Sequence, residues 1–600
     1  MNAPEKLAAL RALMRASGVA ALYVGTTDPH QTESVSAHWK AVQWLTGFTG
    51  SMGYAVVTDS EARLWTDGRY VEQAGREVDG RAFLIHSISD PTAPDWREWL
   101  KNVLAQVPGA ELSLDPEVTS EAMLHDTRAK LPGIQVRLDL SLISQIWENR
   151  PAIPKDPVWE MAPEFAVETR PEKLKRLRKA LSRIGAGAST LLSSLDDIAW
   201  LTNLRGNDNP LYPFFHAYAL VTPERAHLFS DLSKFPADIQ AHLAVDGWTL
   251  HRYNNVAQAL RSLPADSILY VDPAKTPFGL YAAQRDRAVL REGPDLVTAM
   301  KARKTPGEQA NIREANLRES VAVVRLMRWI EENAASGSLY EYAVGQKLEE
   351  FRRLDPLYLQ PANIPIVGYG ENAALPHYRP GPKNTARILP AGFLLFDVCA
   401  QYQCGTTDLT RTVAVGELTE EMRRDYTMAL KAHITLARQK FPCGTTGNLL
   451  DAIAKANLWN HRMNFAHGTG HGMGYVLNVH EGPAKIITEF APLFPYARET
   501  ELEPGMLFSN EPGVYRHGRH GIRIENSILV QNAGDTEFGH FLEFETITFL
   551  PYERKAILTD MLSPEEHSWV NAYHAEVCRK LRPRITPQEA AWLKAQTAPI

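Results

Sequence analysis

Five residues between positions 397 and 525 carry side chains that bind hard metal ions. Four carboxylates and one imidazole suit two divalent cations held close together, with carboxylates shared between them. Such a pair lowers the pKa of a water molecule between the ions, so that a hydroxide nucleophile forms near neutral pH. The set therefore predicts hydrolysis of a small acyl-transfer substrate, with a further carboxylate moving the proton. The five residues are Asp397, Asp408, His471, Glu511 and Glu525.

Each of these residues taken alone has an ordinary structural explanation. An aspartate such as Asp397 or Asp408 more often ends a strand or caps a turn, and a lone histidine more often packs or faces solvent. The chain has no HExxH motif, so the common zinc-peptidase pattern is not indicated. No cysteine belongs to a plausible ligand pair, and the donors fit Mn, Fe, Co or Zn better than Cu. The metal hypothesis therefore depends on the combination.

The elements around these residues must bring them to one place. Asp397 follows the apolar run 393–396, so we predict that it ends a buried strand. Asp408 lies eleven residues further on, which fits a second, antiparallel strand joined by a hairpin, with both side chains at the same cavity. His467 and His471 are four residues apart, but the glycines between them argue against a helix. We expect these histidines on a tight loop or strand.

The first half of the chain repeats itself at an offset of about 160 residues. The motif Pro-Glu-Lys-Leu at 4–7 returns at 171–174, and three further matches keep the same order. This period is too long for a solenoid. We therefore predict two similar α/β domains in tandem, each opening with an amphipathic helix followed by strands. The three further pairs are 45–50 with 201–206, 54–58 with 218–222, and 62–67 with 226–231.

The chain divides into four predicted blocks. Segment 151–163 carries four prolines and reads as a linker. Thr305, Pro306 and Glu308 form a capping box that opens a long helix to Asn333, after which strands alternate with turns through residue 550. The last fifty residues follow helical patterns. The predicted blocks are an α/β domain at 1–150, a second at 151–304, a catalytic domain at 305–552 and a C-terminal extension at 553–600.

Composition narrows the class of protein. The net charge of −6, from 64 basic and 70 acidic residues, argues against nucleic acid as a main partner. The four cysteines form no CxxC pair, which favours a reducing compartment. The N-terminus shows no secretory signal, and no apolar run of about 18 residues is long enough to span a bilayer. We predict a soluble cytoplasmic protein with no membrane partner.

Across residues 1 to about 585 the chain resembles the three-domain Xaa-Pro aminopeptidases (aminopeptidase P) of the creatinase/methionine-aminopeptidase, or pita-bread, fold. The resemblance implies an α/β (α+β) protein: two tandem creatinase-N-like α/β domains, a pita-bread catalytic domain and a short helical C-terminal extension. The first domain contributes His30-Gln31 and Asp67-Gly68-Arg69-Tyr70. The catalytic motifs lie at 405–412, 467–472, 477–483, 510–513 and 523–526, in family order and spacing.

The resemblance supplies a role for each predicted ligand. Asp397 would bind one metal ion through both oxygens, while Asp408 and Glu525 would bridge the two ions. His471 and Glu511 would complete the other site, with Glu511 also acting as the general base. Manganese is the expected metal, and zinc or cobalt would fit the same ligands.

The resemblance also implies residues that handle the substrate. His377, His467 and His480 would orient the scissile carbonyl, shuttle protons and line a proline pocket. Arg523 would support the ligands and the bound substrate, and Arg69 would reach toward the substrate from the first domain. The implied reaction is removal of the N-terminal residue from peptides with proline second, through a hydroxide bridging two divalent metal ions. The family also suggests a homodimer.

Four related protein classes are alternatives. Prolidases, which cleave Xaa-Pro dipeptides, usually carry one N-terminal domain, creatinases lack the metal set, and histone-chaperone relatives have lost their metals. Methionine aminopeptidases lack the long N-terminal half. Two departures bear on the pocket rather than the ligands: Cys399 stands beside Asp397 where the family usually has a smaller residue, and segment 365–372 resembles the shorter bacterial enzymes.

Overall fold

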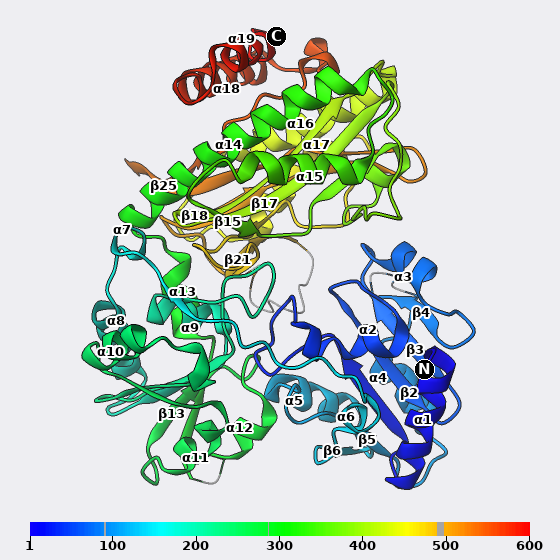
Figure 1. The fold of residues 1–600 in the computed structure, drawn as a ribbon, viewed down its shortest axis with the longest axis vertical. Coiled ribbons are helices and arrows are strands. Elements are labelled where there is room, and N and C mark those ends of the chain that lie inside the picture. Colours follow the sequence, from blue (N-terminus) through cyan, green and yellow to red (C-terminus); the bar gives the residue numbers. More distant parts are fainter. Residues whose placement is uncertain (89, 91, 286, 489–496, 498) are drawn as a thin grey trace. The chain divides into compact units, whose positions relative to one another are not determined.

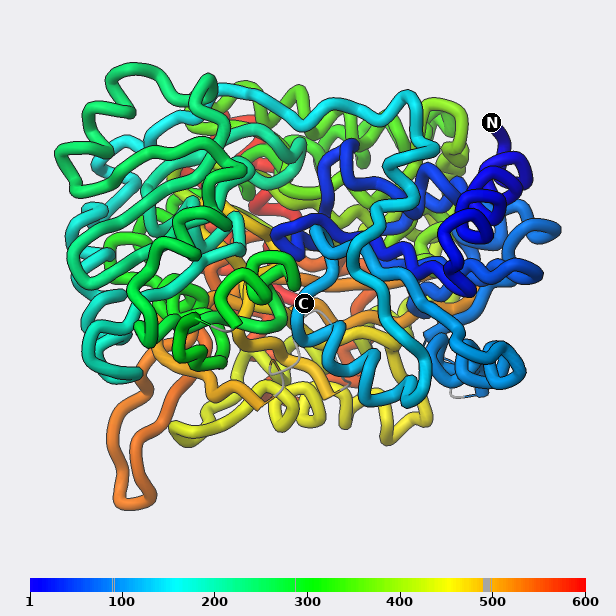
Figure 2. The backbone as a smooth tube through the Cα atoms, turned by 90° about the horizontal axis from the view of Figure 1, so that it is seen from below, coloured from blue at the N-terminus to red at the C-terminus, as the bar shows by residue number. Residues whose placement is uncertain are grey.

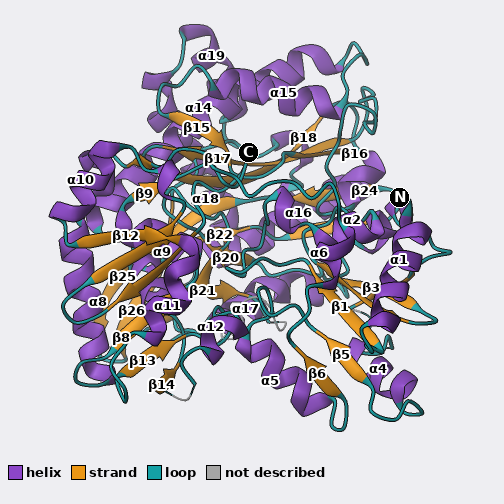
Figure 3. Cartoon of the chain, turned by 60° about the horizontal axis from the view of Figure 1, so that its bottom comes forward, coloured by secondary structure: helices purple, strands orange, loops and turns teal. Residues whose placement is uncertain are grey.

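The computed structural model of the protein describes residues 1–88, 90, 92–285, 287–488, 497 and 499–600. Helices and strands are mixed along the whole chain (Figures 1 and 3). Two compact units form: Met1–Met161 with Glu168–Val297, and Ala162–Val167 with Thr298–Ile600. The first unit contains the tandem repeat and the second contains all five predicted metal ligands. The predicted block boundaries stay predictions.

The first unit contains two six-stranded sheets. The strands of the first sheet are β1 (Ala21–Gly25), β2 (Gly53–Thr58), β3 (Ala62–Thr66), β4 (Leu84–Ser87), β5 (Glu111–Ser113) and β6 (Gln135–Arg137). Those of the second are β8 (Ser189–Leu192), β10 (Ala217–Val221), β11 (Ala226–Ser230), β12 (Trp248–Arg252), β13 (Ile268–Val271) and β14 (Val289–Glu292). The helices around them are α2 (Ala41–Thr46), α3 (Val71–Glu77), α4 (Trp96–Leu104), α5 (Glu121–Lys130), α6 (Leu142–Ile146), α9 (Leu195–Thr202), α10 (Ala237–Val245), α11 (Val256–Arg261) and α12 (Phe278–Ala282).

The two sheets have the same topology. Their strand orders are β4-β3-β2-β1-β5-β6 and β12-β11-β10-β8-β13-β14. In both, the three central strands pair antiparallel and the outer strands pair parallel to their neighbours. This correspondence confirms the repeat inferred from the sequence.

Each copy opens with the expected helix. α1 (Ala3–Ala16) begins at a capping box, and its Leu7, Leu10 and Met14 are buried at helical spacing. α8 (Arg170–Ile184) begins the same way, and its buried leucines recur at 174, 177 and 181. The predicted linker is only partly a linker, because β7 (Trp159–Glu160) pairs with β9 (Leu204–Arg205) of the second copy.

The second unit is built on strands that form a four-stranded and a six-stranded sheet. β17 (Phe393–Tyr402) pairs with β18 (Gly405–Ala414), β16 (Ile366–Tyr369) and β15 (Tyr358–Pro361). The larger sheet has the order β19-β26-β25-β22-β20-β21. Its strands are β19 (Lys440–Pro442), β20 (Gly470–Gly472), β21 (Glu481–Ile486), β22 (Leu507–Asn510), β25 (Asn526–Thr536) and β26 (Gly539–Thr546). A separate ribbon joins β23 (Gly513–Arg516) to β24 (His520–Arg523), and Figure 2 shows the β25–β26 hairpin projecting from the rest of this unit.

Helices pack against these sheets. The capping box at Thr305 opens α14 (Pro306–Ala334) as predicted, and α14 packs against β18. The predicted alternation of strands and turns after α14 was wrong, because three helices interrupt it. Their apolar residues recur at helical rather than strand spacing, as Tyr426, Leu430 and Ile434 show. The three helices are α15 (Glu341–Arg352), α16 (Glu420–Ala437) and α17 (Gly447–Trp459), while α7 (Pro163–Ala166) and α13 (Leu296–Ala302) lie earlier in the chain.

The last fifty residues are helical, as the sequence predicts. They form α18 (Pro564–Leu581) and α19 (Pro587–Gln596). Val570, Val577 and Leu593 enter the same hydrophobic core as residues of α14 and α16. The extension is therefore part of the second unit's core. None of the described helices is long and apolar enough to cross a membrane.

Candidate metal centre

The β17–β18 hairpin places the first two predicted ligands. Asp397 lies in the middle of β17 and not at its end, because the buried strand continues through Tyr402. Asp397 is opposite Thr410, and Asp408 is opposite Cys399. Since side chains alternate along a strand, these four residues face the same side of the hairpin. The hairpin prediction is confirmed, and the predicted strand end is corrected.

Glu525 reaches the same face from the connection between β24 and β25. Its backbone N–H donates to the carbonyl oxygen of Thr410 at 3.1 Å. The hydroxyl of Thr410 in turn donates to Oε2 of Glu525 at 2.7 Å. Two hydrogen bonds to one residue of β18 therefore fix both the backbone and the carboxylate of Glu525.

His471 lies in β20, and Glu511 directly follows the neighbouring strand β22 of the larger sheet. His471 is the central residue of β20, and its Nε2 lies 3.4 Å from Oδ2 of Asp408 and 3.4 Å from Oε1 of Glu511. Nδ1 contacts the carbonyl oxygen of Gly472 at 3.1 Å, which turns Nε2 toward the carboxylates. Ser509 accepts from the His471 N–H at 3.0 Å and donates to Oε1 of Glu511 at 3.3 Å.

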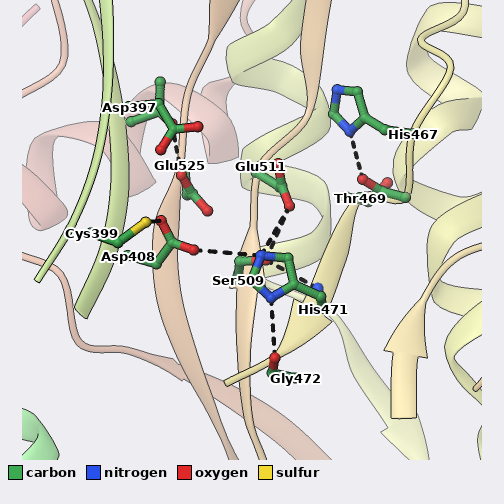
Figure 4. A network of polar contacts seen from close by, with 12 residues as sticks. Asp397, Cys399, Asp408, His467, Thr469, His471, Gly472, Ser509, Glu511 and Glu525 are labelled. Atoms are coloured by element: carbon green, nitrogen blue, oxygen red, sulfur yellow. Dashed lines mark hydrogen bonds and ion pairs between the residues drawn. The ribbon is translucent and has the colours of Figure 1, made fainter. Parts of the chain in front are cut away.

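All five predicted ligands thus come together (Figure 4). One ligand atom each of Asp408, His471 and Glu525 lie within 4.8 Å of one another. The same limit holds for Asp397, Cys399 and Asp408. Residues separated by more than 100 positions in the sequence are therefore close enough to share small ions.

Burial and mutual repulsion raise the pKa values of the carboxyl groups. Burial, followed by the charge of Asp397, raises the pKa of Asp408 to about 7. Burial likewise raises the pKa of Glu511 to about 7. The pKa of Glu525 lies well above its usual range, because burial and the neighbouring carboxylates both oppose its charge. The groups around the centre therefore do not fully balance the negative charge of its carboxylates.

Arg523 supplies the guanidinium of this centre. Its Nη2 donates to Oδ2 of Asp397 at 2.6 Å, and its Nη1 donates to the hydroxyl of Tyr515 at 2.8 Å. Among the described residues, the Arg523 guanidinium and the imidazoles of His471 and His480 act on these four carboxylates. The donor set, all oxygen and imidazole with excess negative charge, fits two hard divalent cations.

The three predicted substrate histidines are connected to the site through different neighbours. His480 packs edge-on against His471, with ring centroids 4.3 Å apart. Nε2 of His467 lies 2.9 Å from the hydroxyl of Tyr515, which also contacts Arg523. His377 follows Pro376, whose carbonyl oxygen accepts from Arg523 at 3.2 Å.

Arg69 belongs to the first unit, where it pairs with Asp67 at 2.6 Å. Its predicted role at the substrate stays a prediction.

Sequence reasoning missed three residues of the site. Thr410 is two residues from Asp408, so strand alternation could have placed both on one face. Ser509 stands two residues before Glu511 and offered the same signal. Tyr515 joins His467 to Arg523, and nothing in the sequence marked it, because that contact forms only when β23 lies beside residue 467.

Cys399 lies inside the centre, as its position in the sequence suggested. Its Sγ is 2.8 Å from Oδ1 of Asp408, and 3% of the residue is exposed. Burial and the charges of Asp408 and Asp397 hold the pKa of the thiol well above its usual range. The thiol therefore remains protonated at neutral pH in the metal-free protein and donates to the carboxylate.

Sequence families cover most of the chain. Residues 6–143 and 149–308 each match creatinase/prolidase N-terminal domains. Residues 310–532 match metallopeptidase family M24, and residues 540–600 match the C-terminal region of peptidase M24. Both α/β copies and the unit with the metal centre are therefore covered.

Full-length relatives carry the same architecture. The chain is 35% identical over its whole length to a probable Xaa-Pro aminopeptidase P from Fusarium vanettenii and covers 99% of it. It is 32% identical to Xaa-Pro aminopeptidase 2 from Sus scrofa and covers 89% of that protein. A crystal structure of an X-prolyl aminopeptidase from Caenorhabditis elegans, described as a cytosolic enzyme with a di-nuclear active site, matches with a TM-score of 0.93 and 31% identity over 100% of both chains. The chain therefore belongs to the Xaa-Pro aminopeptidases of metallopeptidase family M24, and it is a hydrolase.

Proposed function

We propose that this chain removes the N-terminal residue from peptides with proline at the second position. The observation that carries the proposal is the buried cluster of four carboxylates and His471, in which burial and neighbouring charges raise the pKa values of Asp408, Glu511 and Glu525. In a family of this kind, the cluster would hold two divalent ions through Asp397, Asp408, His471, Glu511 and Glu525. Bound there, the ions supply a nucleophile from water at neutral pH and polarise the scissile carbonyl.

The protein's own residues orient the reactants and move protons. Glu511, whose Oε1 lies 3.4 Å from Nε2 of His471, would take up the proton of the attacking water as the general base. Arg523 donates to Oδ2 of Asp397 and so orients this carboxylate, and both of its oxygens keep lone pairs for a metal ion. His467, which contacts Tyr515, and His480, which packs against His471, hold and protonate the substrate in this proposal. His377 is the third proposed substrate histidine. Arg523 holds the backbone next to it by donating to the carbonyl oxygen of Pro376.

Selectivity for proline has a physical basis. The bond before proline is a tertiary amide, with no N–H to donate and a restricted geometry. A pocket that is complementary in shape to the proline ring can therefore select it, while a ligand for the free α-amine confines cleavage to the first residue.

The family resemblance also assigns Arg69 to substrate binding, and an Arg69→Ala variant with unchanged kcat/KM would refute that role.

Three finer assignments belong to the same proposal. Manganese is the proposed metal, and zinc or cobalt suits the same donors. A cytoplasmic location is proposed, since the full-length structural relative from Caenorhabditis elegans is described as cytosolic. A homodimer is proposed from the family resemblance alone.

Three peptides and one substitution test the activity. Purified protein should release arginine from Arg-Pro-Pro but not from Arg-Ala-Pro, and preference for the dipeptide Arg-Pro would indicate a prolidase instead. Asp408→Asn should reduce kcat at least about 1000-fold, because it removes a predicted bridging ligand. Elemental analysis should show fewer than two ions per chain in this variant.

The matched control is Asp535→Asn, which makes the same change on the exposed part of β25. Wild-type turnover in the Asp408→Asn variant would contradict the metal assignment.

A further inference from the structure

The C-terminal extension places one hydroxyl in a buried polar network. Tyr573 of α18 is 7% exposed, and its Oη accepts from Nη2 of Arg411 at 3.1 Å and from the N–H of Leu550 at 3.2 Å. The hydroxyl also lies 2.9 Å from the carbonyl oxygen of Leu550 and 3.0 Å from that of Thr548, to which it can donate. A single hydroxyl therefore joins α18 to β18 and to the chain leaving β26.

Arg411 continues this network to a predicted metal ligand. Its guanidinium is buried, and Nη1 donates to the carbonyl oxygens of Thr410 at 2.9 Å and Glu525 at 2.7 Å. Nη2, which also contacts Tyr573, donates to Oδ1 of Asn526 at 2.8 Å. One side chain thus holds the backbone at Glu525 and the residue after it, next to the threonine whose hydroxyl binds the Glu525 carboxylate.

Packing alone does not require this hydroxyl. The ring of Tyr573 stacks on Tyr552, with centroids 4.7 Å apart, and on Trp569 at 5.5 Å. A phenylalanine would fill the same space between these rings. A buried hydroxyl stabilises a protein only where it is hydrogen-bonded, and this one has partners on β18, on β25 through Asn526, and on the chain leaving β26.

We infer that the C-terminal extension positions Glu525 in the metal centre, with Tyr573 acting through Arg411. The inference rests on the proposed function, in which Glu525 is a ligand. Tyr573 is a positioning residue, because Arg411 stands between it and the ligand. Hydrogen-bonded groups behind a ligand orient it and tune its affinity for the metal.

The variant Tyr573→Phe tests this inference. Removing the hydroxyl takes a partner from Arg411 but keeps the stacked ring. We expect the affinity for Mn²⁺, measured by chelator competition, to fall about 10–100-fold. We also expect a changed visible spectrum of the Co²⁺-loaded protein, and a lower kcat with little change in KM.

Trp569→Phe is the matched control. This residue lies one turn before Tyr573 on α18 and contacts Tyr573 and Tyr552 through its ring. The substitution should lower the free energy of unfolding but leave the Mn²⁺ affinity and the Co²⁺ spectrum as in the wild type. Comparing the two variants separates the polar connection from the packing of the extension.

A measurement on the wild-type protein keeps the inference testable if Tyr573→Phe does not fold. Coupling between two sites is reciprocal, so metal loading must also stabilise the connection to α18. Amide hydrogen exchange in segment 548–552 and α18 should slow on Mn²⁺ loading by more than exchange in α15, a helix of the same unit.

The outcomes are distinct. Unchanged Mn²⁺ affinity and Co²⁺ spectrum in Tyr573→Phe would overturn the inference, as would equal slowing of exchange in α15 and α18. A wild-type protein that binds no divalent ions would instead contradict the proposed function itself.

Discussion

Strand β17 takes part in two buried acidic clusters that balance their charge differently. At its C-terminal end, Tyr402 donates to Oε2 of Glu319 at 2.9 Å, and Nε of Arg352 lies 3.1 Å from both carboxylate oxygens. Near its middle, Asp397 stands in a group of four carboxylates that Arg523 contacts through Asp397. The first cluster pairs one carboxylate with the Arg352 guanidinium, whereas the second gathers four carboxylates, among which Arg523 forms its ion pair with Asp397.

This difference distinguishes a cluster with a structural role from one suited to binding metal ions. Burying a carboxylate is costly unless a cation and hydrogen bonds balance it. Around Glu319 the chain supplies the cation permanently, so the cluster is complete when the protein folds. Around Asp408 and Glu511, whose pKa values rise to about 7, the balancing charge must come from protons or from bound cations. The stability of the second cluster should therefore depend on pH and metal, and that of the first should not.

Removing the cation of the balanced cluster should have the largest effect on stability. Arg352→Met leaves Glu319 buried and without its ion pair, so we expect the free energy of unfolding to fall by about 3–5 kcal/mol. The loss should be the same with and without metal. Urea unfolding of both forms measures it.

The matched control is Arg353→Met, one residue further, where the arginine side chain is 73% exposed in its pair with Glu349. A change below about 0.5 kcal/mol is expected there. If Arg352→Met cost as little as this control, the contrast between the two clusters would collapse.

Removing a charge from the unbalanced cluster should have the opposite sign in the metal-free protein. Asp408→Asn relieves repulsion, so near pH 8 we expect the metal-free variant to be more stable than the metal-free wild type by about 1–3 kcal/mol. Adding Mn²⁺ should reverse the order, because only the wild type keeps all its ligands. Thermal or urea unfolding after chelation, with and without added metal, measures both differences.

The pH dependence follows from the same carboxyl groups. Folding raises the pKa of Asp408 to about 7, above its usual value near 4 in an unfolded chain. Between pH 4 and 7 the folded metal-free protein therefore binds more protons than the unfolded one, so this group's contribution to stability grows as the pH falls. The advantage of Asp408→Asn should accordingly shrink from pH 8 to pH 5. His433, whose pKa burial lowers to about 3, acts in the opposite direction but equally in both proteins. An advantage that grew toward pH 5 would contradict this explanation.

Local patterns predicted the parts of the molecule that depend on neighbouring residues. The capping box before α14 and the opening helices α1 and α8 follow from short motifs, and the β17–β18 hairpin follows from the spacing of Asp397 and Asp408. The repeat predicted two similar α/β domains, because similar sequences have similar local preferences, and the two sheets indeed have the same topology.

Contacts between distant segments could not be predicted in this way. Arg523 and Asp397 are 126 residues apart, and Tyr573 and Arg411 are 162 apart. Whether a buried acid has a cation thus depends on the tertiary fold, which no short motif encodes. The end of β17 was also misplaced, since polarity at Asp397 suggested a boundary where the strand in fact continues.

The smallest predicted effect concerns the neutral donor in the unbalanced cluster. The Cys399 thiol donates to Oδ1 of Asp408 at 2.8 Å, which withdraws electron density from an oxygen that the metal needs. At pH 8.5, above the pKa of about 7 of Asp408, Cys399→Ala removes a hydrogen bond that competes with the metal for this oxygen, so it should raise the affinity for Mn²⁺ about threefold. The small cavity should cost about 1 kcal/mol of stability. Chelator competition and urea unfolding measure the two changes.

Cys404→Ala separates these two contributions. Cys404 is buried in the same hairpin, in the turn between β17 and β18, and packs with Ala315, Ala400 and Tyr402. Its loss should reduce stability by a similar amount and leave the metal affinity unchanged. If both variants bound Mn²⁺ as the wild type does, the Cys399 thiol would only fill space. The acidity of the cluster would then be set by its carboxylates and Arg523 without help from a neutral donor.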